Sequence, residues 1–166
     1  MSDTPRQPRT ASDERPVLLT LTVAGQLCGV PVLAVRDVLG PRAITRVPLA
    51  PPEIAGSLNL RGRIVTAIDL RRRLGLPPAG QPQMSIVAEQ GSELYALLVD
   101  QVSEVMTLDP SAFEPNPPTL GKHWMDFSTG IFRLEGQLLV VLDVPRLLAL
   151  PHGDRTATSP SVPAGP

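Results

Sequence analysis

The residues with the chemistry for nucleophilic catalysis are Cys28, His123 and His152, the single cysteine and the two histidines of the chain. A thiolate and an imidazole base can together attack a carbonyl or phosphoryl group. Cys28, however, stands in the apolar run LCGVPV, where a thiol usually packs as an inert small hydrophobe. The three residues also lack the spacing of a zinc site, and no glycine-rich phosphate loop joins a strand to a helix. The sequence therefore predicts no catalytic residue, no metal and no cofactor.

Two aspartates and a run of arginines offer other chemistry. Asp69 and Asp143 each follow an apolar segment and precede a short Arg- and Leu-rich segment, so we expect each to cap a helix rather than to share a catalytic site. The run Arg71–Arg73 is able to bind phosphate, which makes a nucleic-acid-binding β-barrel module the alternative function. Because the formal net charge is −1, no basic field concentrates nucleic acid. We interpret the run as a solvated helix face.

Length and composition indicate one small domain. The chain has 166 residues, of which 42% are hydrophobic but 3% aromatic, so Val, Leu, Ile and Ala must form its core. The polar, proline-containing segments 1–16 and 151–166 are predicted to be disordered tails. The N-terminus lacks the apolar core of a signal peptide, and no apolar run reaches the ~20 residues that span a bilayer. These features predict a cytoplasmic protein without direct membrane insertion.

Strand patterns dominate between the tails. The run VLLTLTVAG from Val17 alternates apolar and polar residues with a period of two, which is typical of a half-buried strand. A turn at Gly25 and a second apolar run predict a hairpin. In VLAVRDVLG, from Val32, the apolar residues are spaced by three and four, which predicts a short helix that ends at Gly40.

An internal repeat organises the chain. AGSLNLRGRIVTAIDLRRRLGL, from Ala55, matches STGIFRLEGQLLVVLDVPRLLAL, from Ser128, with every equivalent pair separated by 74 positions. The pairs are Gly56 and Gly130, Gly62 and Gly136, Asp69 and Asp143, Arg72 and Arg146, and Leu74 and Leu148. The preceding blocks correspond at a separation of 67 positions, with Leu27 on Leu94, Val35 on Val102 and Asp37 on Glu104.

The repeat predicts an all-β fold with short helices. Two units, about 17–76 and 83–150, each hold material for about five short strands, and intertwining of the two is possible. Strands at this spacing favour small antiparallel barrels, whose closure removes exposed edges. Side chains fill barrels of this size. A functional site is therefore expected on the outer faces or in the groove between the units.

The repeat blocks resemble the signature of the CheW family, in which an NLRG turn and an apolar strand ending in Asp-Leu-Arg follow one another. The resemblance continues in AVRDVLGPRAITRVPLAPPEIAG, LLVDQVSEVMTLDPSAFEPNPP and TGIFRLEGQLLVVLDVPRLL, and it covers nearly everything in 17–150. It implies two SH3-like five-stranded β-barrel subdomains. It also implies a non-catalytic adaptor that couples chemoreceptors to a CheA-type histidine kinase, with one barrel face on the kinase regulatory domain and the groove on the receptor's cytoplasmic tip.

The resemblance further implies partner-binding residues at matching positions. They are Val35, Asp37, Gly56, Arg61, Met84 and Val105. Burial statistics would place Val105 and Met84 in a core if each were taken without the resemblance. Asn59 and Gly62 are interpreted as turn residues, because both tolerate positive φ.

Arg61 and Asp37 are expected to form a charge-assisted pair at the rim of the groove. Such a pair serves a partner or is a surface salt bridge worth ~0–1 kcal/mol. Glu135 occupies the position of Arg61 in the second copy, so Arg61 is not part of the repeated architecture. The only tryptophan, Trp124, either anchors an interface or covers the open end of the second barrel, and we favour the cover.

Overall fold

Two β-sheets and a few short helices make up the fold. The computed structural model describes residues 15–80 and 83–149, so His152 and most of both predicted tails lie outside the described residues. In chain order the elements are β1 (Val17–Val23), β2 (Gln26–Pro31), η1 (Val32–Ala34), β3 (Asp37–Leu39), β4 (Ile54–Leu60), β5 (Arg63–Asp69), α2 (Leu70–Arg73), β6 (Met84–Gln90), β7 (Glu93–Val99), β8 (Gln101–Thr107), η2 (Pro110–Ala112), β9 (Phe113–Glu114), α3 (Lys122–Met125), β10 (Ser128–Leu134), β11 (Gln137–Leu142) and α4 (Val144–Leu148).

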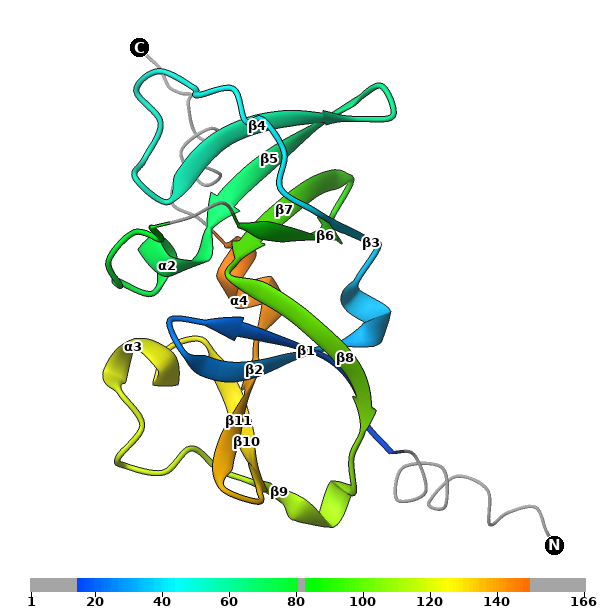
Figure 1. Cartoon of the computed structure of the whole chain (residues 1–166), viewed down its shortest axis with the longest axis vertical. Coiled ribbons are helices and arrows are strands. Elements are labelled where there is room, and N and C mark those ends of the chain that lie inside the picture. The colour runs from blue at the N-terminus through cyan, green and yellow to red at the C-terminus, as the bar shows by residue number, and fades with distance from the viewer. Residues whose placement is uncertain (1–14, 81–82, 150–166) are drawn as a thin grey trace, which may run out of the picture.

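The strands form one six-stranded and one five-stranded sheet. Sheet A has the order β8-β1-β2-β11-β10-β9, and sheet B has the order β3-β6-β7-β5-β4 (Figure 1). Sheet B lies in the upper half of that view and sheet A in the lower half, with α2 and α4 near the level where they meet. The predicted all-β architecture of two SH3-like subdomains is confirmed, with the two-residue β9 as an extra edge strand of sheet A.

The two copies of the repeat exchange strands. β5 of the first copy pairs in parallel with β7 of the second, and β11 of the second pairs in parallel with β2 of the first. Two antiparallel pairs also join the copies: β3 of the first pairs with β6 of the second, and β8 of the second pairs with β1 of the first. Units 17–76 and 83–150 are therefore not separate barrels, because each sheet needs strands from both; this is the intertwining that the sequence allowed.

The helix predicted from Val32 is largely wrong. A single 3-10 turn covers Val32–Ala34, and Asp37–Leu39 forms strand β3 instead. Pro31 at the N-cap position provides no side-chain hydrogen bond to start a helix. β-Branched valines favour extended backbone, and β3 pairs with β6 at the edge of sheet B. Cross-strand pairing thus decides a segment whose spacing alone suggested a helix.

The predicted hairpin and helix caps are confirmed. β1 and β2 pair antiparallel around a turn at Ala24 and Gly25. The side chain of Asp69 accepts hydrogen bonds from the backbone N–H groups of the second and third residues of α2, and Asp143 accepts one from the N–H of Arg146 in α4. Each capping side chain satisfies backbone donors that have no partner inside so short a helix.

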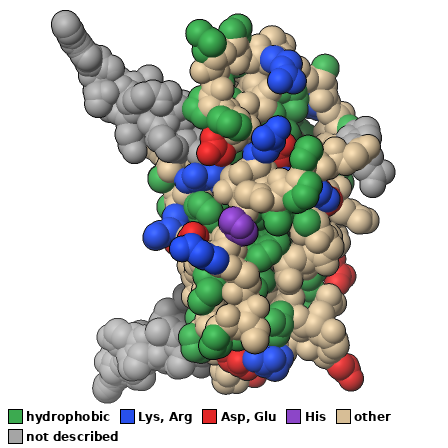
Figure 2. Space-filling view, turned by 90° about the vertical axis from the view of Figure 1, so that its left-hand side faces the viewer, with side chains coloured by type: hydrophobic (Ala, Val, Ile, Leu, Met, Phe, Trp, Pro, Cys, Tyr) green, Lys and Arg blue, Asp and Glu red, His purple; other side chains and the backbone are tan. Residues whose placement is uncertain are grey.

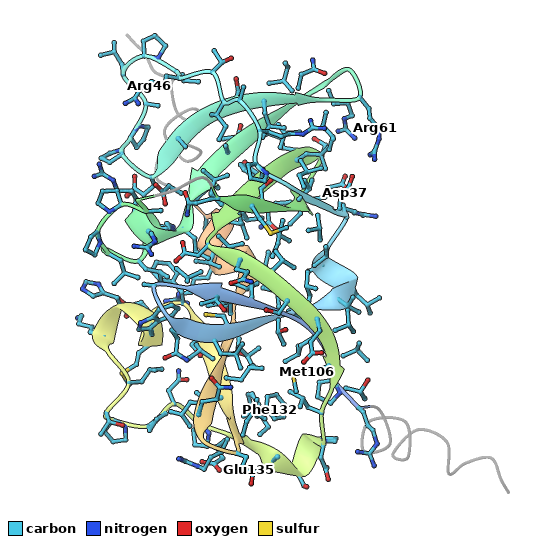
Figure 3. The ribbon with its side chains drawn as sticks, in the orientation of Figure 1. Asp37, Arg46, Arg61, Met106, Phe132 and Glu135 are labelled. Carbon is cyan, nitrogen blue, oxygen red and sulfur yellow. The ribbon has the colours of Figure 1, made fainter. Side chains whose placement is uncertain are left out.

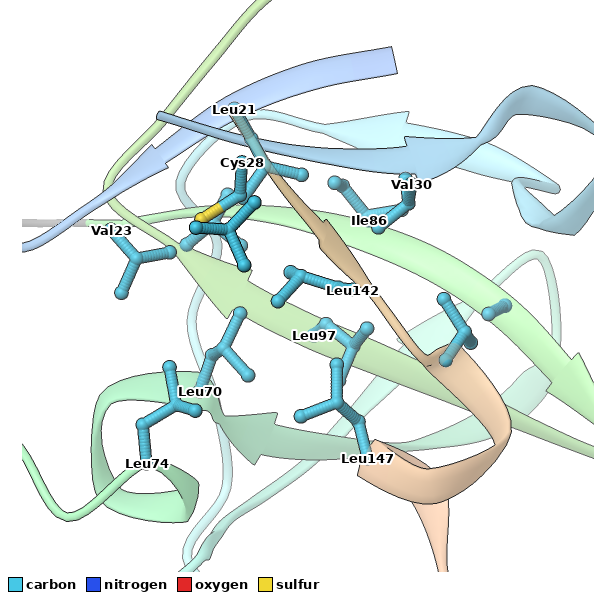
Figure 4. Close-up of a cluster of buried hydrophobic side chains, with 14 of the residues drawn as sticks. Leu21, Val23, Cys28, Val30, Leu70, Leu74, Ile86, Leu97, Leu142 and Leu147 are labelled. Atoms are coloured by element: carbon cyan, nitrogen blue, oxygen red, sulfur yellow. The ribbon is translucent and has the colours of Figure 1, made fainter. Parts of the chain in front are cut away.

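The largest hydrophobic cluster lies between the two sheets. It joins side chains of sheet A, such as Leu21 and Cys28, to side chains of sheet B, such as Ile86 and Leu97, and it includes Leu147 of α4 (Figure 4). Smaller clusters fill the opposite face of each sheet. The space between the sheets is therefore packed at its centre.

Candidate partner-binding surfaces

The turn between β4 and β5 has an unusual backbone. Arg61 and Gly62 have φ values of +51° and +85°, so both central residues are left-handed, as in a type I′ turn. The Asn59 side-chain oxygen accepts a hydrogen bond from the Gly62 N–H at 3.0 Å, which confirms the predicted turn chemistry of this pair. Left-handed backbone costs a residue with a Cβ about 1 kcal/mol or more. The turn thus holds an arginine where asparagine or glycine would be more stable.

The predicted pair of Arg61 and Asp37 is present. Nη2 of Arg61 lies 3.0 Å from Oδ2 of Asp37, with the two side chains 76% and 26% exposed (Figure 3). A second ion pair, which the sequence did not indicate, joins Nη2 of Arg36 to Oε1 of Glu89 at 2.9 Å. It arises because β3 pairs with β6, which places the start of one strand beside the end of the other.

These pairs surround a shallow groove of about 250 Å³ on sheet B. Its rim, called the charged rim below, consists of Arg36, Asp37, Arg61, Arg63 and Glu89. Its apolar lining is Leu60, Val87 and Leu94. Three basic and two acidic groups around a small apolar floor suit a polar helical segment that offers one or two apolar side chains.

A second, larger groove lies on sheet A. It has a volume of about 700 Å³ and is called the apolar groove below. Its lining is Arg15, Pro16, Val17, Leu18, Pro31, Val32, Leu33, Pro110, Phe113, Phe132 and Val141. Leu33 is 94% exposed and Phe113 is 44% exposed, and the ring of Phe113 stacks at a tilt on that of Phe132, with centroids 5.3 Å apart. Exposed apolar side chains around one groove mark a contact surface for another protein.

Sequence reasoning missed the apolar groove. The helix predicted from Val32 rested on the spacings of three and four among Val32, Val35, Val38 and Leu39, a pattern that does not include Leu33. This exclusion was the available signal, because a large apolar side chain off the core-facing pattern points to solvent. Phe113 carried no such signal, since a lone aromatic in a proline-rich segment is compatible with core or surface.

The remaining predicted residues differ in exposure. Val105, on edge strand β8, is 55% exposed, so its assignment to a core is wrong and it is available for contact. Val35 and Met84 are partly buried and pack against the central cluster. Gly56 is buried with φ at +149°, and a Cβ there would collide with the Thr45 carbonyl oxygen, so it affects a partner only through the backbone it shapes.

The arginine run is not the solvated face that the sequence suggested. Arg71 donates two hydrogen bonds to Asp100, at 2.9 Å and 2.6 Å. Arg73 donates to three backbone carbonyls at the end of α4 and stacks over Phe127, 4.7 Å from the ring centroid. Only Arg72 of the run has an exposed side chain. The acidic partner Asp100 is 29 positions from Arg71, which the local pattern does not reveal.

Trp124 and Cys28 both contribute to packing. Trp124 is partly buried and packs against the central cluster. Cys28 is fully buried, and desolvation by burial raises its thiol pKa far above the ordinary range. Its Sγ donates a hydrogen bond to the carbonyl oxygen of Gln26 at 3.4 Å. A thiol held protonated in a core is a poor nucleophile.

Within residues 15–80 and 83–149, no group of three His, Cys, Asp or Glu side chains is arranged to hold a metal ion. No helix in these ranges has the length and apolar character to cross a bilayer.

Comparison with known proteins identifies the family. The family model described as CheW-like domain matches residues 17–152. The chain belongs to the CheW family. It is 31% identical over 130 residues to the chemotaxis protein CheW of Rhizobium meliloti (strain 1021), which covers 76% of this chain and 83% of that protein. This family is one of chemotaxis scaffold proteins.

Two other members of the family align with a larger share of the chain. The chemotaxis protein CheW of Bacillus subtilis (strain 168) is 29% identical over 149 residues, which is 88% of this chain and 92% of that protein. The crystal structure of the scaffolding protein TtCheW from Thermoanaerobacter tengcongensis superposes with a TM-score of 0.73 at 28% identity, covering 82% of this chain and 94% of that one. The intertwined pair of sheets therefore belongs to a fold already seen in a family scaffold.

Proposed function

We propose that this chain is a non-catalytic cytoplasmic adaptor that couples chemoreceptors to a CheA-type histidine kinase. One observation carries the proposal: the chain holds two separate contact surfaces of different chemistry, the charged rim on sheet B and the apolar groove on sheet A. A catalytic protein needs one site with converging reactive groups, whereas an adaptor needs two surfaces that bind different partners.

The charged rim is proposed to receive the helical tip of a receptor. Arg61 and Asp37 offer one donor group and one acceptor group to polar side chains of a helix, and Arg36 and Glu89 offer a second such pair. Of the residues implied by the family, Gly56 belongs to the same hairpin and contributes indirectly.

The apolar groove is proposed to bind a barrel face of the kinase regulatory domain. Leu33 and Phe113 project from the groove, and two apolar surfaces of this kind bury each other when barrels pack face to face. Val105 is exposed on edge strand β8, in register with Leu19 of the central cluster, so it is proposed as a contact residue on the other face of sheet A. Val35 and Met84 pack against the same cluster and are proposed to act through it. By holding both partners, the adaptor raises the effective concentration of kinase beside receptor, which links kinase activity to receptor state.

Separate binding assays test the two surfaces. We expect Arg61→Ala to weaken binding to a receptor cytoplasmic fragment about tenfold and to leave the kinase regulatory domain bound as before. We expect Leu33→Asp to do the reverse, because a carboxylate in the groove must be desolvated. Matched controls are Glu135→Ala, the equivalent turn position of the second copy, and Leu49→Asp, at a leucine that is 102% exposed on another loop.

Two outcomes would overturn the proposal. Wild-type protein that binds neither a receptor fragment nor a kinase regulatory domain contradicts the adaptor function. Binding to RNA with a steep salt dependence would favour the nucleic-acid alternative instead. The contacts of Arg71 and Arg73 within the fold do not support that alternative, because their guanidinium groups already have protein partners.

A further inference from the structure

Asp100 lies where the chain passes from one sheet to the other. It follows β7 of sheet B and precedes β8 of sheet A. Its carboxylate accepts two hydrogen bonds from Arg71 of α2 and one, at 2.8 Å, from the N–H of Ala24 in the β1–β2 turn. Its own N–H donates to the carbonyl oxygen of Thr22 at 3.0 Å. One residue is therefore held by elements of both sheets.

Arg73 makes a second connection between the sheets. Its guanidinium donates to the carbonyl oxygens of Arg146, Leu147 and Ala149 at 3.1 Å, 3.1 Å and 2.8 Å. These carbonyls lie at the C-terminal end of α4, which follows β11 of sheet A, whereas Arg73 ends α2, which follows β5 of sheet B. The planar group also stacks on Phe127, just before β10. A cation at a helix C-terminus satisfies carbonyls that have no intrahelical partner.

Both arginines come from the same four-residue helix, but they contact the segments that flank sheet A at two different places: Arg71 at Asp100, which precedes β8, and Arg73 at the end of α4, which follows β11. Figure 2 shows the face that carries α2 and α3, where basic and acidic side chains gather near mid-height. Two directional contacts at separate points restrict rotation of one sheet on the other more than one contact does. The central hydrophobic cluster holds the sheets together, but apolar packing is non-directional. Fork-shaped guanidinium contacts have a defined geometry.

We propose that α2 is an orientation lock, in which Arg71, Arg73 and Asp100 are positioning residues that fix the angle between sheets A and B. The consequence for signalling rests on the proposed function. β5 runs directly from the turn that carries Arg61 into α2. Asp100 leads directly into β8, which pairs with β1, and Val17 and Leu18 of β1 line the apolar groove. The lock therefore sets how the charged rim and the apolar groove are oriented relative to each other, and thus how the two partners are oriented in one complex.

Distance measurements between spin labels test the lock without any partner. Labels at Ile64→Cys and Glu135→Cys place one exposed probe on β5 of sheet B and one in the β10–β11 turn of sheet A. Native Cys28 is fully buried, out of reach of the label. We expect Arg73→Met combined with Asp100→Asn to broaden the distance distribution about twofold, because one directional restraint is lost and the other keeps a single acceptor oxygen. Arg73→Lys keeps the charge but not the fork, so its distribution should be intermediate.

Arg72→Met is the matched control, since Arg72 lies on the same helix with an exposed side chain. Its distribution should equal that of the unsubstituted labelled protein. Circular dichroism establishes that each variant is folded, and the single variants Arg73→Met and Asp100→Asn serve if the double variant does not fold. An unchanged distribution in folded Arg73→Met and folded Asp100→Asn would overturn the lock.

A second measurement tests the consequence. We expect the variants to bind a receptor fragment and a kinase regulatory domain separately with wild-type affinity, but to form the three-component complex about tenfold more weakly. A broadened distribution with an unaltered three-component complex would show that orientation does not matter for assembly. Failure of the unsubstituted protein to bind either partner would contradict the proposed function, while the label distances would still decide the lock.

Discussion

The two copies of the repeat share their glycine backbone conformations but differ at the surface, and the first turn residue is left-handed at Arg61 but not at Glu135. In the hairpins β4–β5 and β10–β11, Gly56 and Gly130 have φ values of +149° and +157°, and each lies at a register shift between the strands. The turn glycines Gly62 and Gly136 have φ values of +85° and +84°. The recurring residues are thus the ones that the chain geometry requires.

The equivalent positions that differ between the copies are those whose side chains make a contact in only one of them. Arg61 pairs with Asp37 in the first copy, whereas Glu135 at the equivalent position carries no such pair among the described residues. In the first copy, the Arg73 side chain donates hydrogen bonds to backbone carbonyls at the end of α4, including that of Leu147. Leu147 is the equivalent residue of the second copy, and its side chain is fully buried in the central cluster. Equivalent positions therefore take opposite roles around the same contact. The copies therefore share their architecture and differ at the positions that are proposed to bind partners.

Truncating these two equivalent positions should have the largest and most unequal effects. We expect Leu147→Ala to lower the free energy of unfolding by about 4 kcal/mol, because it leaves a cavity in the central cluster. Arg73→Ala should lower it by about 1 kcal/mol, since the lost hydrogen bonds are partly replaced by water. Urea denaturation followed by circular dichroism measures both values. Equal losses in the two variants would contradict the assignment of different roles.

The equivalent glycines provide a sharper comparison, because their backbones match and their neighbours do not. A Cβ on Gly56 would meet the Thr45 carbonyl oxygen, which is fixed by the pairing of Thr45 with Ser57. A Cβ on Gly130 would meet the ring of Phe113, which is 44% exposed on the two-residue strand β9, and also the Glu114 carbonyl oxygen at 2.8 Å. We expect Gly56→Ala to cost about 3 kcal/mol of unfolding free energy and Gly130→Ala about 2 kcal/mol. Thermal unfolding of the two variants measures both losses. A larger loss for Gly130→Ala than for Gly56→Ala would show that β9 yields less to the added Cβ than Thr45 does.

The repeat and its caps were predictable because local sequence encodes them. A glycine in a turn and an aspartate before a helix act within four residues of themselves, so Gly62 and Asp69 revealed their roles without the structure. Strand exchange was not predictable in the same way. Since both copies carry the same strand pattern, β5 has an equally suitable neighbour in β2 and in β7, and no local feature decides between them.

Only part of the candidate site could be predicted from the sequence. The family resemblance identified Arg61 and Asp37, which the structure brings together. The signal for Leu33 was its place outside the apolar spacing of the helix predicted from Val32, and the structure has no such helix. The contact of Arg71 with Asp100 depends on how two sheets meet, so it requires the tertiary structure.

Replacing Arg61 by asparagine should have the smallest effect on stability and separate stability from function. Asparagine tolerates the left-handed φ of +51°, and this gain offsets the loss of an exposed ion pair worth at most ~1 kcal/mol. We expect the free energy of unfolding to change by less than about 0.5 kcal/mol while receptor binding falls about tenfold. Glu135→Asn, at the equivalent turn, should change neither quantity by a comparable amount. If Arg61→Asn destabilises the fold and leaves receptor binding intact, then the arginine serves the architecture of sheet B, and the asymmetry between the two turns has no functional meaning.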